Sequence, residues 1–483
     1  MRVLAIASEM HPLMKTGGLA DVVGALPAAL LPEKVQVTTL LPAYPQVLRR
    51  IGGPVRTVKQ YADLFGGPAR IRAARVGDAR LFLLDAPRLF AREGPPYTDA
   101  HGNDWPDNWQ RFAALSRAGA DIAAGTVPRY RPDIVHAHDW QGALAMAYMR
   151  FGPAARVPSV LTIHNIAFQG RFPATIFPAL DLPDRAFAVD GVEYYGGVGY
   201  LKAGIWYADA ITTVSPTYAA EIREPAFGMG LEGLIDVRSD ALTGIVNGID
   251  TAEWNPETDA ALASRFSMDT LKKRSHNRRA LIERFGLDVG DGPLFVVVSR
   301  LTWQKGMDLL VDATDTIVAL GGSLAVLGSG DASLESGLLA AAARHPGRVA
   351  VDIGYDEALS HLMQGGGDAI LVPSRFEPCG LTQLYGLRYG CVPVVARTGG
   401  LADTIIDANT AALAAGVATG LHFRAGDGAA FHAAIRRAAE LFAMPKIWAK
   451  MQQQGMRADF SWKNSASRYS GLYTSLIAAR NHA

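Results

Sequence analysis

Cysteine is scarce in this chain, and that scarcity excludes a disulfide-stabilised class of protein. Only Cys379 and Cys391 occur among 483 residues, so no disulfide framework is expected and a reducing cytoplasm is the default location. Their spacing is not that of a zinc site. The N-terminal stretch MRVLAIAS is typical of a first β-strand rather than of a signal peptide.

The chain also lacks an excess of charge of one sign. Its 47 Lys and Arg residues nearly balance 46 Asp and Glu residues, for a net charge of +1, so neither a nucleic-acid nor a membrane partner is expected. No apolar run reaches the length of a membrane span. Asp-x-Asp, the commonest carboxylate pair for a metal–diphosphate complex, is absent. We therefore expect metal-independent chemistry, with no metal site and no cofactor.

Short Val- and Ile-rich runs alternate with amphipathic helical patterns along the whole chain, which is typical of parallel α/β units. The predicted strands of the first half are 3–8, 37–42, 133–138, 159–164 and 210–215. Those of the second half are 294–299, 323–328, 349–354, 369–374 and 392–397. Turn chemistry at 244–256 predicts a domain boundary there. The turn- and aromatic-rich region 43–110 is expected to be a loop insertion that lines a cleft.

The hexapeptide Thr-Gly-Gly-Leu-Ala-Asp occurs twice, at 16–21 and 398–403. Each copy follows an apolar β-branched run and precedes a helical pattern, so the repeat indicates two similar halves. In the first copy, Gly17 and Gly18 let the backbone approach an anion at a helix N-terminus, and Lys15 adds a charge suited to phosphate. Lys15, Gly17, Gly18 and Asp21 are therefore predicted to bind substrate. The alternative is an ordinary glycine-bearing turn beside a surface lysine.

The segment SRLTWQKG at 299–306 places two cations after a predicted strand. Arg300 lies at the strand end, and Lys305 lies at the entrance to a helix predicted over 306–320. A positive charge at a helix N-terminus opposes the helix dipole, which indicates an anionic ligand. Two cations here can neutralise the diphosphate of a departing nucleotide. The alternative is two solvated residues at a helix start.

The segment SRFEPCGLTQLYGLRYG at 374–390 is the most specific stretch. Glu377 follows the strand 369–374, where its carboxylate can accept hydrogen bonds from sugar hydroxyls or offset positive charge on an oxocarbenium-like carbon. The alternative is a helix-capping acid. The residues Gly380, Leu381 and Thr382 begin a helix whose free N–H groups can bind phosphate. Cys379 is expected to be a packed residue beside the site rather than a nucleophile.

Polar residues also end two strands of the first half, where ligands bind in open parallel sheets. These residues are His138, Asp139, His164 and Asn165. The pair His136 and His138 shares one strand face, but two ligands without a third make a weak metal site. We expect Asp139 to orient a substrate hydroxyl or a neighbouring group.

Two further positions remain open between a binding and a structural role. Tyr355 follows the strand 349–354 and can stack on a nucleobase, or can cover the core as a loop aromatic. Asn247 lies at the boundary, where it either binds substrate or forms a turn.

Together these segments resemble the bacterial glycogen synthase family, which is closely related to plant starch synthases. The resemblance rests on KTGGLADV, HAHDWQ, IHNIAFQG, GIVNGID, SRLTWQKG and SRFEPCGLTQLYGLRYG, which occur in the family's order over essentially the whole chain. It implies an α/β GT-B architecture of two Rossmann-like, doubly wound domains facing across a cleft. We place these domains at 1–245 and 246–460, with a helix at 461–483 that crosses back to the first domain.

The resemblance also implies site roles. Arg300 and Lys305 match the pair that stabilises leaving ADP, and Glu377 matches the acid that contacts glucose. Tyr355 matches the adenine-stacking position. His164, with Asp139 and Asn247 nearby, lies on the face where glucose and acceptor meet. The residues Gly380, Leu381 and Thr382 match the helix N-terminus that binds phosphate. One departure from the broader retaining GT-B pattern is Tyr385, which stands eight residues after Glu377 in place of a second glutamate.

The implied reaction moves glucose from ADP-glucose to the non-reducing end of an α-1,4-glucan, with retention, by front-face displacement. Catalytic residues in both halves lead us to expect domain closure. A UDP-glucose-preferring synthase is the nearest alternative. A glucan phosphorylase, which needs a pyridoxal phosphate lysine, and a non-catalytic sugar-nucleotide-binding protein are less favoured. Oligomeric state does not follow from the sequence.

Overall fold

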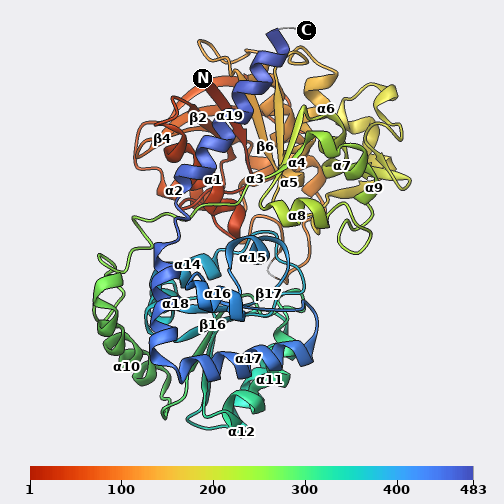
Figure 1. The fold of residues 1–483 in the computed structure, drawn as a ribbon. Coiled ribbons are helices and arrows are strands. Elements are labelled where there is room, and N and C mark those ends of the chain that lie inside the picture. Colours follow the sequence, from red (N-terminus) through yellow and green to blue (C-terminus); the bar gives the residue numbers. More distant parts are fainter. Residues whose placement is uncertain (100, 482–483) are drawn as a thin grey trace. The chain divides into compact units, whose positions relative to one another are not determined.

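The computed structural model describes residues 1–99 and 101–481, which form two compact units (Figure 1). Unit 1 comprises Met1–Gly248 and Trp462–Ala483, and unit 2 comprises Ile249–Ser461. Each unit is built on its own mainly parallel sheet flanked by helices. Among the described helices, none has the length and apolar character needed to cross a membrane.

The large sheet of unit 1 has nine strands. Across the sheet they are β12 (Leu242–Gly244), β11 (Ala210–Thr213), β7 (Ser159–Ile163), β6 (Ile134–His138), β1 (Arg2–Ile6), β2 (Gln36–Pro42), β5 (Ala79–Asp85), β4 (Ala69–Val76) and β3 (Arg56–Tyr61). Neighbours from β12 to β5 are parallel. The five strands predicted for this half are all present, because strands covered on both faces give continuous apolar runs.

The region 43–110 differs from the expected loop insertion. It contains helices α2 (Pro45–Arg50) and α3 (Pro87–Phe90) and the start of α4 (Asn108–Ala123), and strands β3, β4 and β5 extend the main sheet. Strands β3 and β4 run antiparallel to their neighbours. In β4, only Ala69, Ile71 and Ala74 are buried, and the other residues are half-buried or exposed. Such strands expose one face to water, so they lack the continuous apolar run that identified the parallel strands.

The remaining elements of unit 1 are helices, short 3-10 helices and a small second sheet. The helices are α1 (Gly18–Leu30), α5 (Asp139–Ala143), α6 (Ala145–Arg150), α7 (Tyr200–Tyr207), α8 (Pro216–Glu221), α9 (Glu232–Val237) and α19 (Trp462–Asn481). Short 3-10 helices lie at Ala174–Leu180, Asp184–Ala186 and Ser239–Ala241. A small sheet pairs β10 (Gly197–Gly199) with β8 (Arg171–Pro173) and β9 (Glu193–Tyr194).

The C-terminal helix α19 packs within unit 1, although the chain reaches it only after completing unit 2. It lies against α1 (Figure 1). Its residues Trp462, Tyr469 and Tyr473 share a buried cluster with residues of α1 and β1. The Tyr473 hydroxyl lies 2.8 Å from Nδ1 of His136 on β6. Aromatic residues at helical spacing thus give this helix its apolar face.

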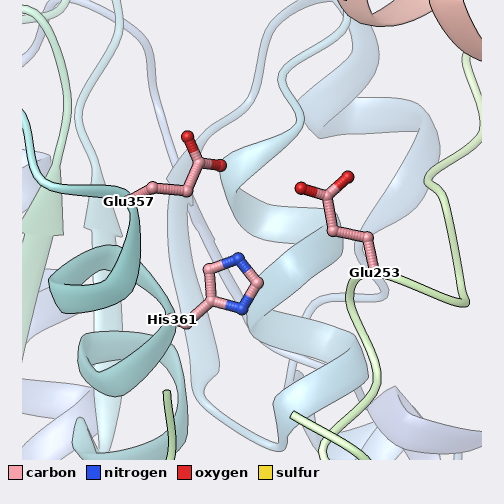
Figure 2. A group of neighbouring side chains, drawn as sticks. All are labelled: Glu253, Glu357 and His361. Atoms are coloured by element: carbon pink, nitrogen blue, oxygen red, sulfur yellow. The ribbon is translucent and has the colours of Figure 1, made fainter. Parts of the chain in front are cut away.

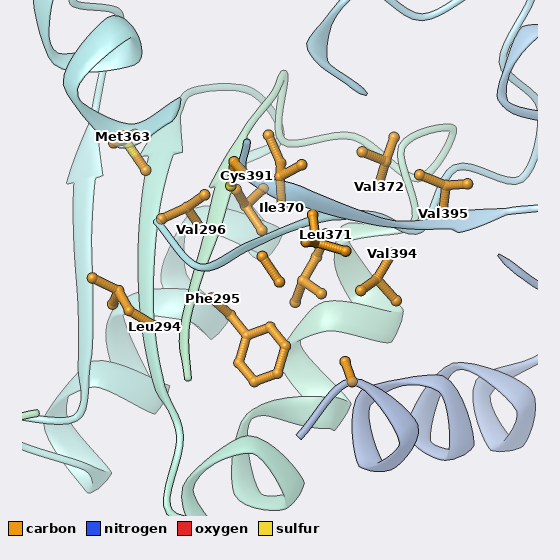
Figure 3. Packing of buried hydrophobic residues seen from close by; sticks show 14 of the residues in the cluster. Leu294, Phe295, Val296, Met363, Ile370, Leu371, Val372, Cys391, Val394 and Val395 are labelled. Carbon is orange, nitrogen blue, oxygen red and sulfur yellow. The ribbon is translucent and has the colours of Figure 1, made fainter. Parts of the chain in front are cut away.

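Unit 2 contains a six-stranded, fully parallel sheet. Its order is β15 (Val349–Ile353), β14 (Ser323–Gly328), β13 (Leu294–Val298), β16 (Ala369–Val372), β17 (Val392–Ala396) and β18 (Leu421–Phe423). The central strands carry almost completely buried residues, which pack together in Figure 3. Helices occupy Arg274–Phe285 (α10), Met307–Ala319 (α11), Ala332–Arg344 (α12), Glu357–Gly366 (α13), Thr382–Tyr389 (α14), Gly399–Thr404 (α15), Thr410–Ala415 (α16), Gly428–Phe442 (α17) and Pro445–Arg457 (α18), with a 3-10 helix at Met268–Lys273.

Candidate active site

In unit 1, the first hexapeptide forms the turn into α1. Gly18 begins the helix and Gly17 precedes it in extended conformation. Lys15 and Asp21, at the two ends of the predicted binding segment, form an ion pair of 2.9 Å. A Cβ atom built on Gly17 would meet nothing within 4 Å. The turn therefore leaves open space beside Gly17, next to the first N–H groups of the helix.

Glu9 supports this turn, and sequence reasoning missed it. Its carboxylate accepts hydrogen bonds from the hydroxyl (2.6 Å) and the backbone N–H of Thr16, and from the Tyr97 hydroxyl. Burial raises the pKa of Glu9 despite these bonds. The available signal was a polar residue just beyond the carboxyl end of β1, the same signal that identified Asp139 and His164.

Asp139 joins the ends of two neighbouring strands. It is the first residue of α5, directly after β6, and its φ of +53° turns the chain sharply. Its Oδ1 accepts the backbone N–H of His164 (2.7 Å) and that of Asn165 (3.5 Å), both just beyond β7. Burial raises the pKa of this carboxyl to about 7. The three residues are thus brought together as their strand-end positions predicted.

Three buried histidines lie next to one another, two on β6 and one just beyond β7. His164 Nε2 lies 3.0 Å from His138 Nδ1, and His136 Nε2 lies 2.6 Å from the Thr162 hydroxyl. Burial lowers the pKa of His138 to about 3 and that of the other two well below the usual range. These rings are therefore neutral at physiological pH. Both His136 nitrogens are used in hydrogen bonds to Thr162 and Tyr473, so His136 has a structural role.

Asn247 lies near the end of the continuous part of unit 1. It is 5% exposed, and its side-chain oxygen has no hydrogen-bond partner among the described residues. A buried amide oxygen without a partner is costly. This unpartnered oxygen favours a substrate-binding role for Asn247 over a role as a turn former.

In unit 2, two of the predicted catalytic residues are in direct contact. Lys305 Nζ lies 2.5 Å from Glu377 Oε2, and that oxygen also accepts the Ser374 hydroxyl at 3.0 Å. The side chains are 18% and 8% exposed. Arg300, two residues beyond the end of β13, is exposed. The contact joins the loop after β13 to the loop after β16.

Close backbone contacts hold these two loops together. The Arg375 backbone N–H donates to the Gln304 carbonyl at 2.9 Å. Gly306 has a φ of +69°, and a Cβ there would lie 2.0 Å from the Pro373 carbonyl oxygen. The Arg375 guanidinium donates to both Asp308 oxygens at 2.7 Å and lies 4.3 Å from the ring centroid of Trp303. Neither Arg375 nor Trp303 was singled out from the sequence.

The second hexapeptide packs against the Glu377 loop. Gly399 has a φ of +43°, and a Cβ there would lie 1.9 Å from the Glu377 carbonyl oxygen, which accepts the Gly400 N–H at 3.1 Å. The same six residues therefore serve different purposes in the two units. The first copy opens a turn beside empty space, and the second holds a carboxylate-bearing loop.

The other predicted residues of unit 2 precede or follow Glu377 along the chain. Gly380, with a φ of +72°, and Leu381 precede α14, which begins at Thr382. Cys379 is buried and its carbonyl accepts the Gln383 side chain at 3.0 Å. Tyr355 is 65% exposed after β15, and its hydroxyl donates to Glu357. Tyr385, the departure from the broader pattern, stacks on Trp254 at 3.6 Å.

Comparisons with known proteins match both units. Residues 2–237 match the starch synthase catalytic domain family, and residues 280–454 match the glycosyl transferases group 1 family. The chain is 62% identical to a glycogen synthase of Mesorhizobium japonicum, covering 99% of this chain and 100% of that one. It is 60% identical to a glycogen synthase of Novosphingobium aromaticivorans, covering 99% of each.

Solved structures give the same fold. The catalytic domain of starch synthase IV from Arabidopsis thaliana, bound to ADP and acarbose, matches with a TM-score of 0.87 and 31% identity over 99% of both chains. A sucrose-phosphate synthase of Thermosynechococcus elongatus matches with a TM-score of 0.61 at 18% identity, covering 99% of both chains, a likeness of fold alone. The predicted GT-B fold is confirmed.

Proposed function

The chain belongs to the glycogen synthase family and is a glucosyltransferase of glycogen synthesis, and we propose that its donor is ADP-glucose and its acceptor the non-reducing end of an α-1,4-glucan. We further propose that transfer proceeds with retention at the anomeric carbon and without a metal ion. The observation that carries the proposal is the contact of Lys305 with the buried Glu377 in unit 2.

Lys305 and Arg300 are proposed to stabilise the leaving ADP. Both follow β13, at the carboxyl edge of a parallel sheet where ligands of such folds bind. Negative charge grows on the diphosphate as the bond to glucose breaks, and fixed cations placed there stabilise the transition state more than the ground state. Two protein cations would take over the neutralisation that a metal ion provides in other nucleotide-sugar enzymes.

Glu377 is proposed to support the sugar. Its carboxylate is buried and receives the Lys305 ammonium and the Ser374 hydroxyl. An ionised carboxylate near the anomeric carbon offsets oxocarbenium-like charge. In the proposed front-face step, the bond from the anomeric carbon to the phosphate oxygen breaks as the acceptor oxygen bonds to that carbon from the same face. The acceptor proton passes to the leaving phosphate oxygen.

Unit 1 is proposed to bind the donor diphosphate and to present glucose to the acceptor. The open space beside Gly17 and the nearby Lys15 support phosphate binding at the start of α1, and Asp21 positions Lys15 through their ion pair. The strand-end group of Asp139, His164 and Asn165 and the orphan oxygen of Asn247 support hydrogen bonding to sugar hydroxyls. His164 is neutral, so it would act by hydrogen bonding rather than as a charge.

The choice of ADP-glucose rests on likeness to family members. The starch synthase IV structure was determined with ADP. Tyr355, with an exposed ring after β15, supports adenine stacking. Residues of α14, which begins at Thr382, together with Gly380 and Leu381, are proposed to bind phosphate, with Cys379 packed beside them.

The test is a transfer assay with glycogen and either ADP-glucose or UDP-glucose in the presence of EDTA. ADP release matched by glucan growth is the expected result. Growth with UDP-glucose alone would overturn the donor, and loss of growth in EDTA that Mg²⁺ restores would overturn metal independence. No growth with either donor would favour a phosphorylase or a binding protein, and an absorbance spectrum would reveal pyridoxal phosphate.

The configuration of the new linkage, read by NMR, tests retention.

A further inference from the structure

Three side chains outside the proposed transfer residues come together in unit 2. Glu253, Glu357 and His361 each offer one ligand atom, and these atoms all lie within 4.8 Å of one another. Figure 2 shows both carboxylates directed toward the same side of the His361 ring. Glu357 and His361 are one turn apart on α13, and Glu253 approaches from the segment that follows the unit boundary.

The histidine is buried and oriented as a metal ligand would be. His361 is 6% exposed, and its Nδ1 lies 2.7 Å from Oδ2 of Asp259. This bond assigns the proton to Nδ1 and leaves the lone pair on Nε2. Within the described part of the chain, Nε2 has no hydrogen-bond partner, and Figure 2 shows it facing the two glutamates. A carboxylate behind a histidine is the arrangement that fixes the tautomer of metal-bound histidines.

The supporting residues fix this orientation. Asp259 also accepts the Tyr389 hydroxyl at 2.5 Å. Trp254 stacks on the His361 ring at 3.8 Å and 17°, and on Tyr385 at 3.6 Å and 10°. The imidazole is therefore held before any ligand arrives.

The two carboxylates carry charge that no described cation neutralises. Neither Glu253 nor Glu357 takes part in an ion pair within residues 1–99 and 101–481. Glu357 accepts a hydrogen bond from Tyr355, which leaves its other oxygen available. The Glu253 side chain is exposed and therefore able to move. A small movement would bring the three ligands to roughly the 2.0–2.2 Å distances of a zinc centre.

From these observations we propose that Glu253, Glu357 and His361 bind a divalent transition-metal ion, with Zn²⁺ as the representative ion. An imidazole with two carboxylates suits Zn²⁺ and similar ions, whereas Mg²⁺ prefers oxygen ligands alone. Three protein ligands leave one tetrahedral position for water. The ion would tie the segment after the unit boundary to α13 and stabilise unit 2. The site shares no residue with Arg300, Lys305 or Glu377, so the ion takes no part in the proposed transfer step.

The experiment titrates metal-free, full-length enzyme with Zn²⁺ and follows heat release and melting temperature, without donor or glucan. We expect one tight site per chain and a higher melting temperature on binding. Co²⁺ should give visible absorption typical of four-coordinate nitrogen and oxygen ligation. Mg²⁺ should not compete at similar concentrations. Because no transfer is measured, failure here would leave the proposed function untouched.

The decisive variant is Glu253→Gln, because Glu253 is exposed and its carboxylate makes no described hydrogen bond. It should weaken Zn²⁺ binding by about 10- to 100-fold or more, while the metal-free variant melts as the wild type does. Glu257→Gln, at an exposed glutamate of the same segment, is the matched control and should bind normally. Unchanged affinity in Glu253→Gln, equal losses in both variants, or a preference for Mg²⁺ would overturn the proposal. His361→Gln should also lose Zn²⁺ binding. If His361→Gln does not fold, the result for Glu253→Gln decides the question.

Discussion

Lys305 Nζ lies 2.5 Å from Oε2 of Glu377, so the cation proposed to stabilise leaving ADP and the anion proposed to support the sugar are partners of each other. Both side chains are largely buried. Removing either one leaves the other as an unpaired charge, which costs stability as well as function. Experiments on this pair must therefore separate turnover from folding.

Lys305→Ala should lower kcat with ADP-glucose by about 10²- to 10³-fold, because a preorganised charge on the leaving group is lost. Binding of glycogen, measured by affinity electrophoresis, should stay close to wild type. Lys446→Ala, at an exposed lysine at the start of α18, is the control and should leave both quantities unchanged. Equal losses of turnover and glycogen binding would contradict the leaving-group role.

Glu377→Gln should lower kcat by about 10²-fold or more, because the amide keeps the shape of the carboxylate but not its charge. Ser374→Ala removes the other hydrogen bond to Oε2 and keeps the charge, so its effect on kcat should be much smaller. Melting temperatures of both variants show whether folding contributes. Near-normal turnover of Glu377→Gln would rule out electrostatic support of the sugar.

Asp139 should make the stability of unit 1 depend on pH. Burial raises its pKa from 3.8 to about 7, so the folded state holds a proton that the unfolded state has lost. Stability from this group is present below about pH 4 and is lost as the pH rises to about 7. The melting temperature of Asp139→Asn relative to wild type should therefore rise between pH 4 and 7 and then level off. A difference that does not change with pH would contradict the raised pKa.

The two hexapeptides allow a matched comparison at the same motif position. Gly399→Ala should lower the melting temperature and turnover, because a Cβ would lie 1.9 Å from the Glu377 carbonyl oxygen at a φ of +43°. Gly17→Ala meets nothing within 4 Å and should fold normally, while weakening donor binding if phosphate approaches the backbone there. Equal melting temperatures for the two variants would show that the second turn tolerates a side chain.

Much of the fold followed from the sequence. The runs LFVVVS and SLAVLG predicted β13 and β14 to within one residue, because strands buried on both faces give unbroken apolar segments. The edge strand β3 and its neighbour β4 were missed, because their exposed faces carry polar residues. In the site, strand-end position predicted that Asp139 and His164 lie at the carboxyl edge of the sheet, and the structure joins them by a hydrogen bond.

The sequence alone determined the parallel α/β architecture and the residue types at its strand ends, since local periodicity and chain order are enough to specify both. Only the tertiary structure decided which distant residues meet. The contact of Lys305 with Glu377 spans two loops, and the group of Glu253, Glu357 and His361 joins residues more than a hundred positions apart. The identical hexapeptides show the physical reason. Gly17 lies beside open space, whereas Gly399 lies against a carbonyl oxygen. These surroundings are formed by segments elsewhere in the chain, so the local sequence cannot specify them.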